Sequence, residues 1–401
     1  MLNIILDFLK DFKASGLYPS FTPITKGVNE PICTVSGKEY LLFCANNYLS
    51  LSQNEDVKNA GKAAITKYGL GPGGSRVISG DIDIIRELEK RIAKLVGSED
   101  CLTFPTGYMA NIAVFRALMD PLINGRPYKS EDSVIFSDEY NHGSIIDGCK
   151  LSNAKKIIFK HNNLEDLQQK LSENDLPNKL IVTEGVFSLD GEILPLPEYV
   201  NLAKEFKAML MIDDAHGVGI LGNNGGGTGM HYKISIDVDI IMGCMDKAFG
   251  GTGGYLCGKK ELIDYLRITS RSSVLSSAIP AMMAGAMIES VNKIEQGTEA
   301  RNELFTKAKY LKTKLKKIGF NILGVNDIPS VPLFLGDEKI GIQFSTKLWE
   351  RGIMCPVVRW PAVPLGGSRL RIIVMTHHTQ SQLDTFANTC EIVGKEMGIL
   401  A

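Results

Sequence analysis

The fold is decided by the stretch Gly243–Gly254, GCMDKAFGGTGG, which places one lysine, Lys247, ahead of a glycine-rich loop. The apolar run before it, 238–242, is typical of a buried strand. Lys247 is therefore predicted just beyond a strand end, with its amine directed into a site. Burial lowers the pKa of a lysine and frees its amine as a nucleophile, which suits a Schiff base. Most lysines are solvated surface groups, so this interpretation needs support from the rest of the chain.

A second polar run, Asp213-Asp214-Ala215-His216, follows the apolar segment 209–212. An acid at a strand end can hold a proton on a pyridine nitrogen, which makes pyridoxal phosphate (PLP) a stronger electron sink. His216, three residues after Asp213, can then reach a phenolic oxygen of the same ring. Metal ligation is a less favoured alternative, because the sequence shows no further cluster at metal-ligand spacing. A solvated acidic turn stays an equal alternative for this motif alone.

The composition is that of an ordinary globular protein, and 401 residues allow two domains with large cores. With 44 basic and 45 acidic residues the net charge is -1, so nothing indicates nucleic acid or an acidic membrane as a partner. Eight cysteines without CxxC pairs indicate reduced thiols in a cytoplasmic protein. No apolar run is long enough for an integral membrane segment. Residues 1–10 predict an amphipathic helix packed on the protein or on a partner subunit, with membrane contact less favoured.

Short apolar runs alternate with helical stretches along most of the chain. Strands are predicted at 133–136, 157–159, 180–183 and 209–212, and helices at 164–171 and 197–206. Continuously apolar strands separated by helices predict a mostly parallel sheet covered on both faces. Ligands of such sheets bind beyond the carboxyl ends of the strands. A helix over 288–315, with strands at 331–335 and 370–374, then predicts a smaller α+β domain.

Further polar motifs fall at predicted element ends, and each has a plainer alternative. Thr106 lies at a strand end, turn and helix start that suit a phosphate, or that form an ordinary capped helix. His142 can stack on an aromatic cofactor or transfer a proton, although a structural histidine is commoner. Ser188 can orient a ring, or belong to a turn at Asp190-Gly191.

Two arginines open the last predicted strand of the chain. Because side chains alternate along a strand, Arg369 and Arg371 point to the same face. An arginine in this position can grip a carboxylate through two hydrogen bonds. A pair of surface arginines is the favoured alternative when the motif is taken alone.

Together and in this order, these motifs resemble the α-oxoamine synthase family of PLP enzymes. The resemblance runs from FCANNYL at 43–49, through GPGGSR at 71–76, to PAVP at 361–364 and His378-Thr379. It implies an α/β, aminotransferase-like (fold type I) protein whose large domain holds a mostly parallel sheet. The implied division is an N-terminal helix and arm at 1–45, a large PLP-binding domain at 46–290 and a small α+β domain at 291–401.

The resemblance also implies a role for individual residues around the cofactor ring. Lys247 would form the Schiff base with PLP, and Asp213 would pair with the pyridine nitrogen. His216 and Ser188 would approach the ring oxygen, and His142 would stack on the ring. No metal ion is expected.

The remaining roles concern the phosphate, the substrate and a neighbouring subunit. The residues implied to meet the phosphate within one subunit are Thr106, Gly107, Tyr108 and Cys244. Ser276 and Ser277 match positions that reach the phosphate from the neighbouring subunit, which implies a homodimer with shared active sites. Asn46 and Arg371 would hold the carboxylate of the amino-acid substrate.

Several positions depart from the usual family pattern. Cys244 stands where a phosphate-binding threonine is common, and Asp246 precedes the lysine where a small residue is usual. Gly143 replaces a common alanine, and the stretch 121–132 is longer than the family norm. These differences bear on the substrate more than on the chemistry.

The implied activity is an acyltransferase reaction, in which a small amino acid condenses with an acyl-CoA, or a related acyl thioester, and CO2 is released. A reaction like that of 8-amino-7-oxononanoate synthase, with alanine, is favoured over serine palmitoyltransferase-like and 2-amino-3-ketobutyrate CoA ligase-like reactions. Two further alternatives are a PLP aminotransferase and a non-catalytic partner subunit. The acyl chain and the amino acid are not fixed by any residue pattern.

Overall fold

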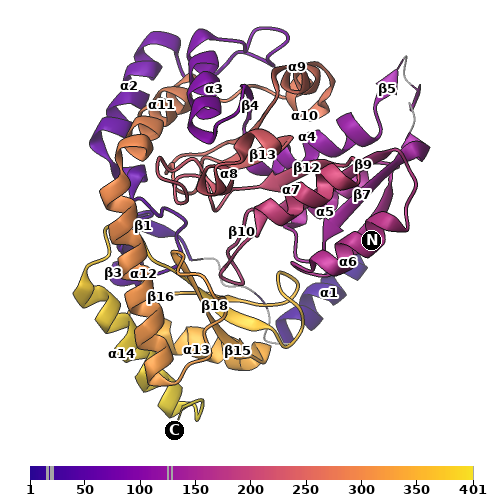
Figure 1. The fold of residues 1–401 in the computed structure, drawn as a ribbon. Helices are drawn as coiled ribbons and strands as arrows, with labels where there is room; N and C mark the ends of the chain where they lie inside the picture. Colours follow the sequence, from indigo (N-terminus) through magenta and orange to yellow (C-terminus); the bar gives the residue numbers. More distant parts are fainter. Residues whose placement is uncertain (15–17, 19–21, 124–125, 128–129, 401) are drawn as a thin grey trace.

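The computed structural model describes residues 1–14, 18, 22–123, 126–127 and 130–400. Its centre is a seven-stranded sheet in the order β4-β14-β13-β12-β9-β7-β8 (Figure 1). The strands span Asp100–Phe104, Gly254–Gly258, Ile240–Cys244, Met209–Asp213, Asn178–Glu184, Ser133–Asp138 and Lys155–Phe159 in that order. Strand β14 runs antiparallel to β13 and β4, and the other neighbours pair in parallel. The prediction of a mostly parallel sheet is confirmed.

Both faces of this sheet are covered, as continuously apolar strands require. In β12, Leu210 and Ile212 belong to one hydrophobic core and Met211 belongs to the other. The first core includes α3 (Asp83–Val96), α6 (Leu164–Ser172), α7 (Leu196–Glu205) and α11 (Ala281–Gln296). The second includes α4 (Gly107–Met119), α5 (Gly143–Leu151) and α9 (Lys260–Thr269). Because side chains point alternately to the two faces of the sheet, successive residues of a strand pack into two separate cores.

The C-terminal part forms smaller sheets that lie below the large one in Figure 1. Strand β15 (Ser330–Gly336) pairs antiparallel with β18 (Ser368–Ile373), which also pairs with β17 (Val357–Val358). A four-stranded sheet joins β1 (Ile24–Lys26), β2 (Ile32–Val35) and β3 (Lys38–Leu42) to β16 (Ile353–Met354). Helices α13 (Glu338–Glu350) and α14 (Gln380–Glu396) pack against each other beside these strands. The N-terminal strands thus join a sheet with a strand from the C-terminal part.

The helix predicted over 288–315 is in fact two helices. Helix α11 ends at Gln296 and α12 (Thr298–Ile318) begins after Gly297 (Figure 1). A Cβ atom at Gly297 would lie 2.7 Å from the carbonyl oxygen of Lys293, so glycine fits the close turn between them. Helix α11 packs on α2 (Glu55–Tyr68) and α3, whereas α12 packs on α14. The predicted domain limits at 45 and 290 stay predictions.

The predicted N-terminal helix is present as α1 (Leu2–Ala14). It has no buried residue, so the rest of the described chain does not cover its apolar side chains. None of the described helices has the length and apolar character needed to cross a membrane. The stretch 121–132 holds β5 (Leu122–Ile123), β6 (Arg126–Pro127) and a short 3-10 helix, η2 (Ser130–Asp132), while 124–125 and 128–129 lie outside the described residues.

The remaining elements are short connectors around the sheets. They are η1 (Leu51–Gln53), β10 (Val186–Phe187), β11 (Glu192–Ile193), α8 (Thr228–Tyr232), η3 (Ser235–Asp237) and α10 (Arg271–Val274).

Candidate active site

The predicted site residues follow the carboxyl ends of neighbouring strands. Asp213 is the last residue of β12, and Lys247 lies three residues beyond the end of β13. His142 follows β7 and caps the first turn of α5. Because β7, β9, β12 and β13 run parallel, these ends meet at the same edge of the sheet. The predicted placement of Lys247 beyond a strand end agrees with the structure.

His216 is held by a tyrosine from the N-terminal part of the chain. The Tyr48 hydroxyl lies 2.8 Å from His216 Nδ1, and Arg371 Nη2 donates to the same hydroxyl oxygen at 3.4 Å. A guanidinium has only donors, so the tyrosine oxygen accepts from Arg371. The direction of the hydrogen bond between Tyr48 and His216 depends on the tautomer of the imidazole. Arg371 Nη2 also donates to Asn46 Oδ1 at 2.8 Å.

Burial holds the pKa of His216 well below its ordinary value, and the nearby Arg371, Lys247 and His142 lower this pKa further. His216 is therefore neutral across the physiological range. The same interactions show that these four side chains, drawn from four separate segments, lie within electrostatic reach of one another.

Lys247 differs from its prediction in the direction of its pKa shift. Burial lowers the pKa of this amine, but Cys244 and Asp246 raise it by more, so the net pKa is above the ordinary value. Because burial also holds the pKa of the Cys244 thiol well above its ordinary value, Asp246 is the negative charge that acts at neutral pH. Lys247 Nζ lies 3.2 Å from Asp246 Oδ2. The lysine is thus protonated and ion-paired rather than a free amine.

The two acids of the 213–216 run have different surroundings, and neither is solvated. Asp213 is buried, and its carboxylate accepts from the Ala215 N–H at 3.1 Å and from Asn111 Nδ2 at 2.8 Å. Asp214 is fully buried and accepts from the backbone N–H and the hydroxyl of Thr228, while burial raises its pKa to about 7. The alternative of a solvated acidic turn is therefore wrong.

The start of α4 lies directly against the end of β13. Thr106 is the N-cap residue, and its hydroxyl accepts from the Met109 N–H at 3.2 Å. A Cβ atom at Gly107 would lie only 2.1 Å from Cys244 Sγ, so only glycine allows this close approach. The N–H groups of Gly107 and Tyr108 lie in the first helical turn, where the helix supplies no acceptor. This helix start can bind an anion close to Cys244.

The backbone of His142 is hydrogen-bonded to an acid. The His142 backbone N–H donates to Glu184 Oε1 at 2.8 Å. Burial raises the pKa of Glu184 well above its ordinary value, and the neighbouring Asp213 raises it further. Next to His142, a Cβ atom added at Gly143 would meet no atom within 4 Å. The departure from alanine to glycine therefore relieves no contact among the described residues.

The three predicted serines make no hydrogen bond with His216, Asp213 or His142 within the described part of the chain. Ser188 is buried beyond β10, and its carbonyl oxygen accepts from the Ser330 hydroxyl. Ser276 and Ser277 lie after α10, and Ser277 is exposed. Arg369, which shares a face with Arg371, is instead paired with Asp190 at 2.6 Å.

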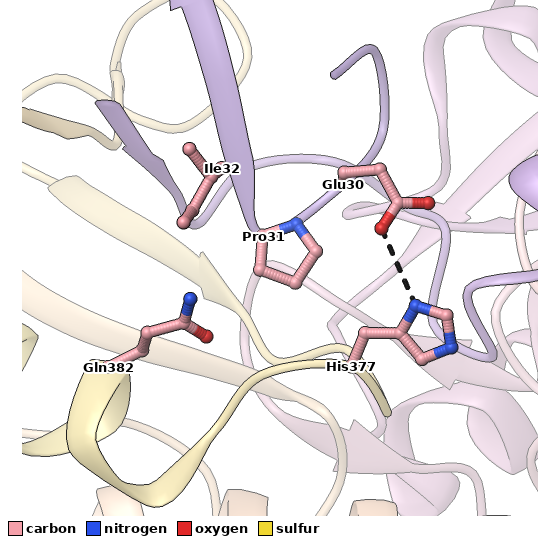
Figure 2. Close-up of a pocket in the computed structure, with 5 residues that line it drawn as sticks. All are labelled: Glu30, Pro31, Ile32, His377 and Gln382. Carbon is pink, nitrogen blue, oxygen red and sulfur yellow. Dashed lines mark hydrogen bonds and ion pairs between the residues drawn. The ribbon is translucent and has the colours of Figure 1, made fainter. Parts of the chain in front are cut away.

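A surface pocket of about 440 Å³ lies apart from the predicted residues. Figure 2 shows its lining, Glu30, Pro31, Ile32, His377 and Gln382, with Glu30 and His377 facing each other. His377 Nδ1 lies 3.4 Å from Glu30 Oε2, and the histidine side chain is 58% exposed. The lining of this pocket includes none of the predicted site residues, so the site is assigned to the strand ends.

Sequence reasoning missed several residues that touch the predicted ones. Tyr48, Asn111, Ser144 and Glu184 each lie close in the sequence to a predicted residue, yet none was predicted to have a role. Their positions within a turn of a predicted residue were the available signal. Their partners were hidden, because Tyr48 and His216 are 168 residues apart and Asn111 and Asp213 are 102 apart.

The residues present fit a PLP group. The cofactor needs an anionic acid for its pyridine nitrogen, an amine for its aldehyde and an anion site for its phosphate. The acid is the buried Asp213, and the amine is Lys247. The anion site is the first turn of α4 at Gly107. The carboxylate of Asp213 is fixed by two N–H donors, which keep it an acceptor. Among the described residues, no group of three metal-ligating side chains is present.

Comparisons with known proteins agree with this geometry. The aminotransferase class I and II family model matches residues 38–389. The 8-amino-7-oxononanoate synthase of Thermosipho melanesiensis is 40% identical over 399 residues, which cover 99% of both chains. Serine palmitoyltransferase of Sphingomonas wittichii superposes with a TM-score of 0.92 at 27% identity, covering 99% of this chain and 98% of its own. A high-resolution structure of SPT with the PLP internal aldimine gives a TM-score of 0.91 at 28% identity, with the same coverage.

The resemblance inferred from the motifs is thereby confirmed over nearly the whole chain. The match spans both the strand-end residues and the C-terminal sheets, so it does not depend on one motif. This chain belongs to the aminotransferase class I and II family and, within it, to the PLP-dependent α-oxoamine synthases.

Proposed function

We propose that this protein is a PLP-dependent acyltransferase that condenses a small amino acid with an acyl-CoA, or a related acyl thioester, and releases CO2. The observation that carries the proposal is the meeting of Lys247, His216, His142 and Arg371 at one sheet edge, beside buried Asp213. The 8-amino-7-oxononanoate synthase reaction is favoured among the family's reactions, because a relative with that name matches 99% of the chain.

PLP supplies an electron sink that stabilises negative charge at the Cα atom of a bound amino acid. With PLP bound, Asp213 would accept a hydrogen bond from the protonated pyridine nitrogen and so keep that proton in place. His216 would donate to the ring oxygen through Nε2, with Nδ1 accepting from the Tyr48 hydroxyl. Ser188 would approach the same oxygen, and His142 would stack on the ring.

Lys247 provides the amine that binds the cofactor and then takes the Cα proton of the substrate on Nζ. Before the reaction starts, Asp246 opposes both cofactor binding and proton removal, because it stabilises the protonated form of the Lys247 amine. Lys247 therefore has to leave this ion pair, 3.2 Å long, before its nitrogen lone pair is available. This exposed aspartate gives the chain a different resting state from one with a small residue at that position.

Arg371 and Asn46 bind the carboxylate of the amino acid. Their mutual hydrogen bond of 2.8 Å presents the guanidinium from β18 of the C-terminal part toward the large sheet. A guanidinium can form two parallel hydrogen bonds with a carboxylate, which orients the substrate as well as binding it. The phosphate is assigned to Thr106, Gly107 and Tyr108, with Cys244 beside them.

The active site is completed by a second copy of the chain in a homodimer. Ser276 and Ser277 reach the phosphate of the partner, which explains why they make no hydrogen bond to this chain's own site residues. Exposed apolar side chains surround the same loop: Leu275 is 71% exposed and Ile78 is 82% exposed. The Ala278 N–H donates to the Gly74 carbonyl oxygen at 3.1 Å, which ties both segments into one face. Burial of that face stabilises a dimer.

The proposed location is the cytoplasm. All eight cysteines are free, and seven of them are buried. Free buried thiols are typical of proteins kept in a reducing compartment.

An absorbance titration tests the proposal and selects the amino acid. The PLP-loaded protein is titrated with glycine, alanine, serine and threonine, and an acyl-CoA is then added. A spectral change with one amino acid, followed by CoA and CO2 release in equal amounts, supports the condensation. Transfer of the amino group without acyl-CoA indicates an aminotransferase instead. The absence of a cofactor band refutes a catalytic role and leaves a partner-subunit role.

A further inference from the structure

We propose that Asn111 and Ser144 are positioning residues that join Asp213 to His142 and fix the protonation of both. The proposal deepens the proposed function and rests on it for the roles of Asp213 and His142. Asn111 lies on α4 and Ser144 on α5, so the bridge connects two helices and the end of β12.

The bridge is a continuous run of short hydrogen bonds. Asn111 Nδ2 donates to Asp213 Oδ2 at 2.8 Å and to Ser144 Oγ at 2.8 Å. Ser144 Oγ lies 2.7 Å from His142 Nδ1. Asn111 and Ser144 are each only 1% exposed, so water does not compete for these bonds.

The direction of each bond follows from the available protons. The Asn111 amide nitrogen carries two hydrogens and gives one to each oxygen. The reverse orientation would set the amide oxygen against the Asp213 carboxylate, where neither atom has a proton. Asn111 Oδ1 has no partner among the described residues, so the two N–H bonds dictate how this side chain lies.

Ser144 transmits this constraint to the imidazole. Its oxygen accepts from Asn111, and because His142 Nδ1 is already an acceptor for the Ser144 backbone N–H, the hydroxyl proton of Ser144 points to Nδ1. The Ser144 backbone N–H donates to the same Nδ1 at 3.2 Å. Because two donors converge on Nδ1, that nitrogen has no proton, and His142 is a neutral ring with its proton on Nε2.

One buried amide thus acts on two groups that hold the cofactor. It keeps Asp213 an acceptor for the pyridine nitrogen and keeps His142 uncharged where it stacks on the ring. A neutral imidazole avoids placing a second positive charge over a protonated pyridine. The proton on Nε2 remains free to donate to a group of the substrate.

The protonation of His142 can be measured without the cofactor. Protein labelled with 15N in its six histidines is examined by long-range 1H–15N NMR, and a His142→Gln sample identifies the signals. A protonated and an unprotonated imidazole nitrogen resonate far apart, whereas the two nitrogens of an imidazolium resonate close together. At pH 7.5 we expect His142 with a bare Nδ1 and a protonated Nε2. A proton on Nδ1 refutes the proposal.

Two variants separate the bridge from general packing. Ser144→Ala removes one donor to Nδ1 and should move the Nδ1 resonance. Asn111→Ala should move the same resonance, although Asn111 does not touch His142. The matched controls are Ser152→Ala, a buried serine at the other end of α5, and Asn174→Ala, a buried asparagine after α6. Both controls should leave the Nδ1 resonance in place, and an unmoved resonance in Asn111→Ala refutes the bridge.

Cofactor binding gives an independent readout. We expect Asn111→Ala to weaken PLP binding about tenfold, the effect of losing one hydrogen bond to a charged group. Ser144→Ala should weaken it less, and the double variant should match Asn111→Ala rather than the product of both effects. Independent effects in the double variant refute the bridge. If wild-type protein binds no PLP yet shows the predicted His142 signals, the proposed function fails and the bridge stands.

Discussion

The hydroxyl of Tyr48 offers the sharpest test of the site geometry. Tyr48→Phe removes only this oxygen from a side chain that is 2% exposed. The hydroxyl lies 2.8 Å from His216 Nδ1 and accepts from Arg371 at 3.4 Å. Tyr199 provides a matched control, because it is also fully buried but its hydroxyl has no partner among the described residues.

Only the first of the two substitutions should destabilise the protein. A lost buried hydrogen bond costs about 1 kcal/mol, and the unpaired His216 Nδ1 adds about 1–3 kcal/mol. We expect Tyr48→Phe to lower the free energy of unfolding by about 2 kcal/mol, which for 401 residues is a fall in Tm of about 2 °C. Tyr199→Phe removes an unsatisfied buried hydroxyl and should be neutral or stabilising by up to about 1 kcal/mol.

Urea unfolding measures the change in stability, and turnover measures the change in activity. If the dependence of the unfolding free energy on urea concentration is the same in both proteins, the shift in the unfolding midpoint reports the stability difference. Because Tyr48 orients His216 and contacts Arg371, Tyr48→Phe should lower kcat/KM at least about tenfold, or about 1.4 kcal/mol of transition-state stabilisation. Tyr199→Phe should retain wild-type turnover. Equal stability and equal turnover in the two variants would show that the Tyr48 hydroxyl orients nothing.

Three further predictions test the lysine, the core and the effect of pH. Lys247→Ala should lose the absorbance band of the cofactor Schiff base and lower turnover by at least about 10³-fold, and full turnover would overturn the assignment. Glu89→Gln breaks the buried pair with Arg76, whose closest contact is 2.6 Å, and should lower unfolding free energy by about 3–5 kcal/mol in urea. The exposed Glu87 provides the control, because Glu87→Gln should change the free energy of unfolding by less than about 1 kcal/mol. Burial lowers the pKa of His378 to about 4. Its contribution to stability is therefore complete above pH ~6.5 and is lost as pH falls toward 4, by about 1.4 kcal/mol per pH unit. The stability difference between wild type and His378→Gln should shrink over this range, and a constant difference would contradict the neutral buried imidazole.

Local sequence patterns were enough to predict the large sheet and the edge that holds the site. Runs such as 180–183 and 209–212 are apolar without alternation, which only a strand buried on both faces needs. Polar residues directly after such runs, Asp213 among them, had to lie at the carboxyl ends. The order of the motifs then identified the family, as the comparisons confirm.

Local patterns were insufficient where a glycine or a neighbouring charge decided the outcome. The 288–315 pattern predicted one helix, but α11 and α12 are separated at Gly297, in a turn where a Cβ atom would lie 2.7 Å from the Lys293 carbonyl oxygen. Lys247 was predicted with a lowered pKa, since burial acts in that direction. The neighbouring Cys244 and Asp246 together raise the pKa of Lys247 by more than burial lowers it, and the reach of these side chains depends on directions that no pattern encodes.

The sequence alone determined which residues have the required chemistry and, through strand and helix periodicity, the sheet edge where most of them gather. Tertiary structure decided their partners. Asn46 and Arg371 are 325 residues apart, and Tyr48 and His216 are 168 apart, yet each pair is joined by a hydrogen bond of 2.8 Å. Periodicity reports the burial of each residue along its own element. It carries no information about which distant element packs opposite, so tautomers and hydrogen-bond partners emerge only when both sheets and their helices are assembled.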